Sequence, residues 1–115
     1  MEQNALAKTT RVNLLYDFYA PLLTEKQRTF LSCYFHDDLS LGEIASEFEI
    51  SRQAVYEHIK RAEATLEEYE NKLQLWEKHV QRKALLGQLK EAALSVQDGS
   101  AERLAQWIKQ LEDIE

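Results

Sequence analysis

The sequence predicts an all-α protein, and three observations support this fold class. The 115 residues include only three Gly and one Pro, whereas sandwiches and barrels need a turn about every 8–12 residues. Ser and Thr residues stand at several positions where a helix N-cap is expected. Apolar residues recur at spacings of three and four along most of the chain, which is the helical period.

The first part of the chain is expected to hold three helices. The segment 6–19 carries apolar residues on more than one side, so we expect two neighbouring elements to cover it. Pro21 then forces a tight link to the next helix. A capping box at 24–27 begins that helix, which should end near His36. A second capping box, at 40–43, begins a helix of about two turns.

A much longer helix is expected after Ser51, which is placed as its N-cap. From Val55 to Val80 the apolar residues are separated by 4, 3, 4, 3, 4, 3 and 4 positions, without Gly or Pro. This regularity predicts about thirty residues of continuous helix. The apolar pattern then slips, so we expect a kink or a short break between 80 and 87. A Gly and a new N-cap within 98–100 predict the turn before the last helix.

Residues 40–62 have the arrangement of a helix-turn-helix: a short helix, a turn of three or four residues and a second helix capped by Ser. We expect six residues to join the two helices at a wide angle: Ile44, Ala45, Phe48, Ile50, Val55 and Ile59. The turn departs from the usual pattern at Glu49, where a left-handed residue is expected and Gly is common. A non-Gly residue there costs about 1 kcal/mol, which the packing of its neighbours can offset.

The outer face of the second helix is the candidate nucleic-acid-binding surface. It consists of Ser51, Arg52, Gln53, Tyr56, Lys60 and Arg61. Arg can pair with guanine through two hydrogen bonds and Gln with adenine, and both residues stand near the N-terminus of the helix. Lys60 and Arg61 are better suited to phosphate.

We divide the chain into an N-terminal helix plus helix-turn-helix at 1–68 and a C-terminal helical arm at 69–115, continuous with it. Five apolar residues of the long helix have no partner within a three-helix unit: Leu66, Tyr69, Leu73, Trp76 and Val80. Either the first and last helices cover them or a second subunit does. We favour a bundle-like homodimer, because large aromatic residues on a long helix are usually buried.

The segment 22–66, LTEKQRTFLSCYFHDDLSLGEIASEFEISRQAVYEHIKRAEATL, resembles the promoter-reading fourth region of bacterial sigma factors. A closer resemblance, over nearly the whole chain, is to the YlxM family, the helix-turn-helix family associated with the signal recognition particle. It rests on 13–19, on 51–56 and on the acidic last helix. The resemblance implies a cytoplasmic bacterial accessory or regulatory protein linked to the signal recognition particle pathway.

The charge of the chain leaves two classes of function open. The net charge is −6, whereas nucleic-acid-binding proteins usually carry a basic excess. Within 51–61, however, three basic residues face one acidic residue, Glu57. The first hypothesis is a regulator that binds DNA or structured RNA. The second is an adaptor that binds protein, for instance a component of the signal recognition particle, without touching nucleic acid.

Other classes of function have no support in the sequence. No nucleophile–base pair, P-loop or dinucleotide-binding motif is present, so we predict neither an enzyme nor a cofactor. Cys33 stands alone and His36, His58 and His79 are scattered, so no metal site is expected. No apolar run approaches the length of a membrane span, and the N-terminus does not resemble a signal peptide. We therefore expect a cytoplasmic protein.

Overall fold

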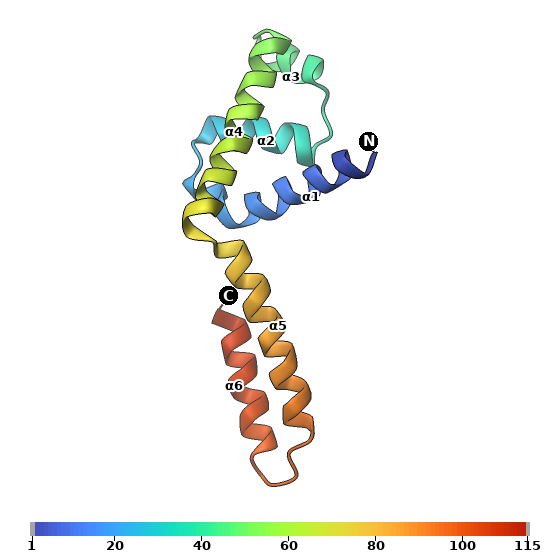
Figure 1. Ribbon diagram of the computed structural model, residues 1–115. Coiled ribbons are helices and arrows are strands. Elements are labelled where there is room, and N and C mark those ends of the chain that lie inside the picture. Colours follow the sequence, from blue (N-terminus) through green and yellow to red (C-terminus); the bar gives the residue numbers. More distant parts are fainter. Residues whose placement is uncertain (1, 115) are drawn as a thin grey trace. The chain divides into compact units, whose positions relative to one another are not determined.

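The computed structural model describes the backbone of residues 2–114 and the side chains of residues 6–114. Throughout this range the regular elements are all helical, which confirms the predicted fold class (Figure 1). In chain order they are α1 (Glu2–Tyr19), the 3₁₀ turn η1 (Ala20–Leu22), α2 (Glu25–Leu31), the π-helical turn η2 (Ser32–His36), α3 (Leu41–Phe48), α4 (Arg52–Leu73), α5 (Leu75–Leu94) and α6 (Ala101–Ile114).

The chain forms two compact units that meet after Gln74. We call residues 2–74 the head and residues 75–114 the hairpin. In the head, α1, α2 and α3 each pack against α4, which is the central helix of this unit (Figure 1). The side chains buried most completely in the head come from all four helices: Leu15, Tyr19, Phe30, Leu31, Ile44, Val55 and Leu66.

Both predicted capping boxes are present in the head. The Thr24 hydroxyl accepts a hydrogen bond from the Gln27 N–H at 3.1 Å, and the Gln27 side chain accepts one from the Thr24 N–H at 3.0 Å. Ser40 and Glu43 make the equivalent pair at 3.0 and 3.1 Å. The helical segment that follows Thr24 ends at His36, as predicted, through the π-helical turn. These hydrogen bonds satisfy backbone N–H groups in the first turns of α2 and α3, which have no partner within the helix.

The prediction of one continuous helix across 51–80 is wrong. Helix α4 ends at Leu73, because Gln74 is left-handed (φ 55°, ψ 33°) and its N–H bonds to the Glu70 carbonyl at 2.9 Å. Helix α5 then runs without a break through Gly87, where the kink was expected. A single left-handed residue interrupts the backbone without disturbing the spacing of apolar residues, so the periodicity did not reveal it.

This break places the division of the chain after Gln74 instead of at residue 68. It also changes the reading of the predicted dimer residues. Leu66 is fully buried within the head, and the half-buried Tyr69 donates a hydrogen bond from its hydroxyl to the Leu22 carbonyl at 3.2 Å. Leu66 is therefore covered by its own chain and not free to meet a partner, and Tyr69 is partly covered. Leu73 and Val80 remain exposed.

The hairpin consists of α5 and α6 packed side by side (Figure 1). Its buried residues are Leu86, Ala93 and Ile108, with Leu104 partly buried against them. The turn contains the expected cap region, in which the Ser100 N–H donates to the Asp98 carboxylate at 2.9 Å just before α6 begins. Gly99 does not have a positive φ, so it is not the left-handed helix-ending Gly that the sequence suggested.

Candidate nucleic-acid interface

The turn between α3 and α4 has the geometry that the helix-turn-helix pattern requires. Glu49 is left-handed (φ 56°, ψ 43°), as predicted for this position, and its N–H bonds to the Ala45 carbonyl. The Ile50 N–H bonds to the same carbonyl at 3.1 Å. The Ser51 hydroxyl then accepts a hydrogen bond from the Ala54 N–H at 3.0 Å, which caps α4. The turn therefore sets the direction in which α4 leaves α3.

Buried side chains fix the angle between these helices. Ile44, Ala45, Val55 and Ile59, all expected in this role, are buried. Phe48 was expected with them but is 39% exposed. The centre of the Phe48 ring lies 5.1 Å from the centre of the ring of Phe30, a buried residue of α2.

The His58 ring stacks almost parallel on the Phe30 ring, with 5.0 Å between the ring centres. Burial lowers the pKa of His58 from its usual value, and the positive charges of Lys26 and Arg61 lower it further. A neutral imidazole is thus favoured against the aromatic ring. The helix-turn-helix is in this way supported by α2 as well as by its own apolar residues.

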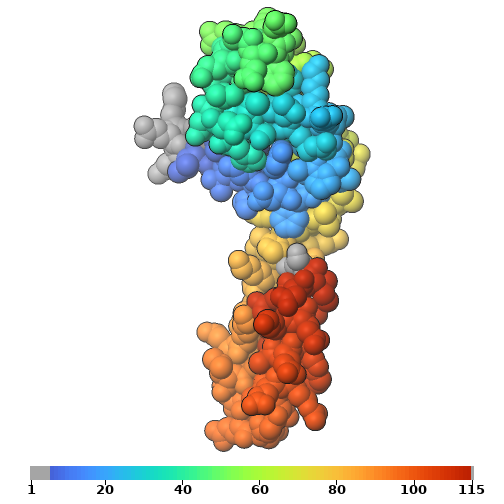
Figure 2. All heavy atoms as spheres, turned by 180° about the vertical axis from the view of Figure 1, so that it is seen from behind, coloured from blue at the N-terminus to red at the C-terminus, as the bar shows by residue number. Residues whose placement is uncertain are grey.

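Five of the six predicted binding residues are exposed: Ser51, Arg52, Gln53, Tyr56 and Arg61. Lys60 is half-buried. In Figure 2 the green residues of the α3–α4 region form one end of the head, away from the blue α1. The first two turns of α4 thus present Arg52, Gln53 and Tyr56, which is 44% exposed, on a surface that the chain itself leaves open.

Arg52 extends toward the start of α3. The Arg52 Nε lies close to Gly42 of α3. It is 3.8 Å from the position that a Cβ atom would take at this glycine, which is ordinary van der Waals contact. Arg52 therefore lies beside the capped first turn of α3, where backbone N–H groups give a partial positive charge. Such a location suits a negatively charged ligand.

Glu57 holds two of the predicted binding residues, a role that the sequence analysis missed. The Gln53 amide donates a hydrogen bond to the Glu57 carboxylate at 3.4 Å, and an Arg61 guanidinium nitrogen lies 3.9 Å from the same carboxylate. Both partners are four residues from Glu57, so the i,i+4 rule could have found them. One carboxylate thus partly neutralises the face.

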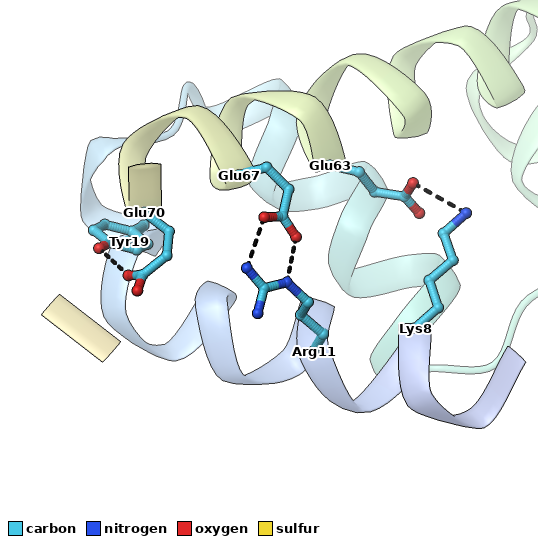
Figure 3. Close-up of polar contacts among 6 residues, drawn as sticks. All are labelled: Lys8, Arg11, Tyr19, Glu63, Glu67 and Glu70. Atoms are coloured by element: carbon cyan, nitrogen blue, oxygen red, sulfur yellow. Dashed lines mark hydrogen bonds and ion pairs between the residues drawn. The ribbon is translucent and has the colours of Figure 1, made fainter. Parts of the chain in front are cut away.

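Lys60 is directed toward another acidic residue. Its ammonium nitrogen lies 3.5 Å from the Glu63 carboxylate and 5.5 Å from the centre of the Tyr56 ring. Lys8 of α1 pairs with the same Glu63 oxygen at 3.4 Å (Figure 3). Lys60 therefore lies at the edge of the candidate surface, and it shares its carboxylate with α1.

Polar contacts continue along the line between α1 and α4 (Figure 3). The Arg11 guanidinium donates two hydrogen bonds to the Glu67 carboxylate, at 2.6 and 2.8 Å. Hydrogen bonding from Arg11 lowers the pKa of Glu67 below its usual value. One turn after Glu67 on α4, the buried Glu70 carboxylate accepts a hydrogen bond from the Tyr19 hydroxyl at 2.5 Å. These contacts hold α4 against α1 behind the candidate surface.

The remaining candidate features of the sequence do not form a site. Over the part of the chain that the structure describes, no three His, Cys, Asp or Glu side chains cluster as a metal site requires. Cys33 is half-buried, and burial raises the pKa of its thiol, which disfavours the reactive thiolate. Among the helices of residues 2–114, none combines the length and the apolar character needed to cross a membrane.

Comparison with known proteins identifies the family. Residues 6–107 match the family described as "UPF0122: Putative helix-turn-helix protein, YlxM / p13 like". A UPF0122 protein of Geobacillus sp. (strain WCH70) is 56% identical over 96% of this chain and 99% of its own length. A UPF0122 protein of Bacillus mycoides (strain KBAB4) is 53% identical over the same shares. The chain therefore belongs to the UPF0122, or YlxM/p13-like, helix-turn-helix family.

Proposed function

We propose that this protein is a non-enzymatic regulatory or accessory factor that binds duplex nucleic acid through the first turns of α4. One observation carries the proposal: Arg52, Gln53 and Tyr56 share an open surface at the start of a capped helix that the head holds firmly in place. The N-terminal end of the second helix is the part of a helix-turn-helix that contacts base edges.

The chemistry of these residues fits direct reading of a base pair. Arg52 can donate two hydrogen bonds to guanine, and Gln53 can bond to adenine through both its amide atoms. Tyr56 and Arg61, one and two turns farther along α4, can contact the phosphate backbone. Few cations take part, so we expect a salt dependence with a slope of about −2 to −3 in log affinity against log salt concentration.

The charge pairs of the surface predict how its affinity can be changed. Glu57→Gln removes the carboxylate that pairs with Arg61 and accepts from Gln53. We expect this variant to bind duplex DNA or RNA more tightly than the wild type. Removing a like charge near phosphate both lowers repulsion and frees the cation.

Fluorescence anisotropy with labelled DNA and RNA duplexes tests the proposal. Arg52→Ala with Gln53→Ala should weaken binding by about 10-fold or more, since a good bidentate base contact contributes about 1–3 kcal/mol. Lys72→Ala is the matched control, because Lys72 is an exposed cation of α4 that lies far along the helix from Arg52. Equal affinity of the double variant and the control would refute the proposal.

A second function, binding of protein, is favoured by the acidic side chains around the same surface. Glu43, Glu47 and Glu49 are exposed on α3 and the turn, and Glu57 is exposed on α4. These carboxylates suit a basic protein segment better than a phosphate backbone. The resemblance to the YlxM family favours a component of the signal recognition particle as this partner.

The two functions differ in what Glu57→Gln should do. For nucleic acid the substitution strengthens binding, whereas for a basic protein segment it removes an attractive charge and weakens binding. The protein and the RNA of the signal recognition particle, each tested alone against both variants, would separate the two functions.

A further inference from the structure

The hairpin has an apolar face that its two helices do not cover. Leu85 and Leu89 lie one turn apart on α5, and Trp107, Leu111 and Ile114 follow one another at helical spacing on α6. Each of these five side chains is about half exposed or more, up to 79% at Ile114. None of them belongs to the buried cluster of the hairpin.

These residues lie on one flank of the hairpin. The ion pair between Lys90 and Glu112, at 3.0 Å, marks the other flank. Lys90 lies five residues after Leu85 on α5, and Glu112 lies five residues after Trp107 on α6. Five residues correspond to about 140° around a helix. Because α5 and α6 are antiparallel, these equal rotations point to the same side, opposite the apolar residues.

We propose that this face binds the same face of a second copy of the chain, so that two hairpins form a four-helix bundle. The first argument is its size. Five large side chains exposed to this degree offer on the order of 500 Å² of apolar surface, which is toward the upper end of the roughly 300–600 Å² found for the largest, often functional, patch on a monomer. Two such faces with their polar rims reach the roughly 1,200–2,000 Å² of a stable interface.

The second argument is charge. In a twofold interface the same patch meets itself, so any net charge on the patch repels its own copy. Here the positions that flank the apolar residues include the uncharged side chains of Gln81, Gln88 and Gln110 and two cations, Arg82 and Arg103, all exposed. The five apolar residues at the centre of the face carry no charge, so the centre can contact itself. Arg82 and Arg103 belong to the rim of the face, where water and salt screen like charges.

The third argument is the small core of the hairpin. Its buried side chains are Leu86, Ala93 and Ile108, with Leu104 partly buried, for two helices of 20 and 14 residues. In a four-helix bundle each helix has two neighbours, and both flanks of its apolar stripe are covered. A second copy of the chain is present wherever the protein is synthesised, and it can supply these missing neighbours.

The mass of the full-length protein in solution tests the proposal, measured by sedimentation or light scattering over about 1–100 µM. We expect the wild type to form a dimer. Trp107→Gln with Leu111→Gln should raise the dissociation constant at least about 100-fold, since buried aromatic residues dominate such interfaces. The matched control is Leu73→Gln with Val80→Gln, which alters exposed residues of the originally predicted interface. This control should change the dissociation constant by less than about threefold.

A second measurement does not depend on the stability of these variants. Trp76→Phe leaves Trp107 as the one tryptophan, and Trp107→Phe leaves Trp76. Dilution of the dimer should shift the emission of Trp107 to the red, because its ring becomes exposed to water, and should leave that of Trp76 unchanged. A monomeric wild type, a dimer that is retained in the Trp107/Leu111 double variant, or unchanged Trp107 emission on dilution would each overturn the proposal.

Discussion

Helix α4 of the head and helix α6 of the hairpin both carry apolar residues at spacings of three and four but differ in how many neighbours cover them. In the head, α4 contacts three helices, and Leu66 on it is fully buried. In the hairpin, α6 has the same spacing of apolar residues, but Trp107 and Leu111 are about half exposed. Periodicity thus shows which side of a helix is to be covered. It does not show whether the cover comes from the same chain.

A core substitution should give the largest difference between the two units. Leu66→Ala leaves a cavity in a fully buried site, and we expect a loss of about 2–5 kcal/mol in the free energy of unfolding. Leu94→Ala in the hairpin, where the side chain is 86% exposed, should cost less than about 0.5 kcal/mol. Urea denaturation followed by circular dichroism measures both. Similar losses for the two variants would contradict the contrast.

The polar contacts of the two units should differ in the same way. Tyr19→Phe removes a donor to the buried Glu70 carboxylate, and we expect a loss of about 1.5–3 kcal/mol. Lys90→Ala removes the exposed ion pair with Glu112, which should contribute at most about 1 kcal/mol. Measuring the free energy of unfolding of both variants tests whether Tyr19→Phe costs more than Lys90→Ala. A loss for Lys90→Ala that matches Tyr19→Phe would show that the hairpin is less exposed than described.

The turn of the helix-turn-helix offers a gain in stability. Glu49→Gly relieves a left-handed non-Gly residue and should stabilise the head by about 1 kcal/mol. Glu49→Val, with a branched side chain at the same φ, should destabilise it. Thermal unfolding of the wild type and the two variants provides the test. A loss of stability with Gly would mean that the Glu49 side chain contributes more than its backbone costs.

The smallest effect should be a pH dependence of the head. Hydrogen bonding from Arg11 lowers the pKa of Glu67 in the folded state. The resulting stabilisation is complete above the usual pKa of 4.5 and is lost as the pH falls through the lower, folded value. The pair is partly exposed, so we expect only a few tenths of a kcal/mol. Arg11→Met should flatten this part of the stability curve below pH 4.5, whereas an unchanged curve would argue against the pair.

Local features of the fold were predictable because their causes are local. The capping boxes at Thr24 and Ser40 and the left-handed turn at Glu49 each follow from a few adjacent residues, and the structure confirms them. The break at Gln74 was not predictable in this way. Gln carries no sign of a left-handed conformation, and the apolar spacing continues across it.

The candidate site was predictable in its exposure but not in its charge pairs. The sequence placed Arg52, Gln53 and Tyr56 on the outside, where the structure has them. It did not reveal that Lys60 shares the Glu63 carboxylate with Lys8, because Lys8 lies far from both residues in the chain. Nor could it separate Leu66, which α1 and its neighbours bury, from the exposed apolar residues later in the same stripe.

The pairing of α1 with α4 has a consequence for synthesis of the chain. Arg11 and Tyr19 contact residues 56 and 51 positions later, so the inner side of the first helix has no cover when it is made. At about 5–20 residues per second, the ribosome takes several seconds to reach those partners. During this interval Leu15 and Tyr19 are open to other apolar surfaces. The N-terminal helix is therefore made several seconds before the residues of α4 that cover its inner side.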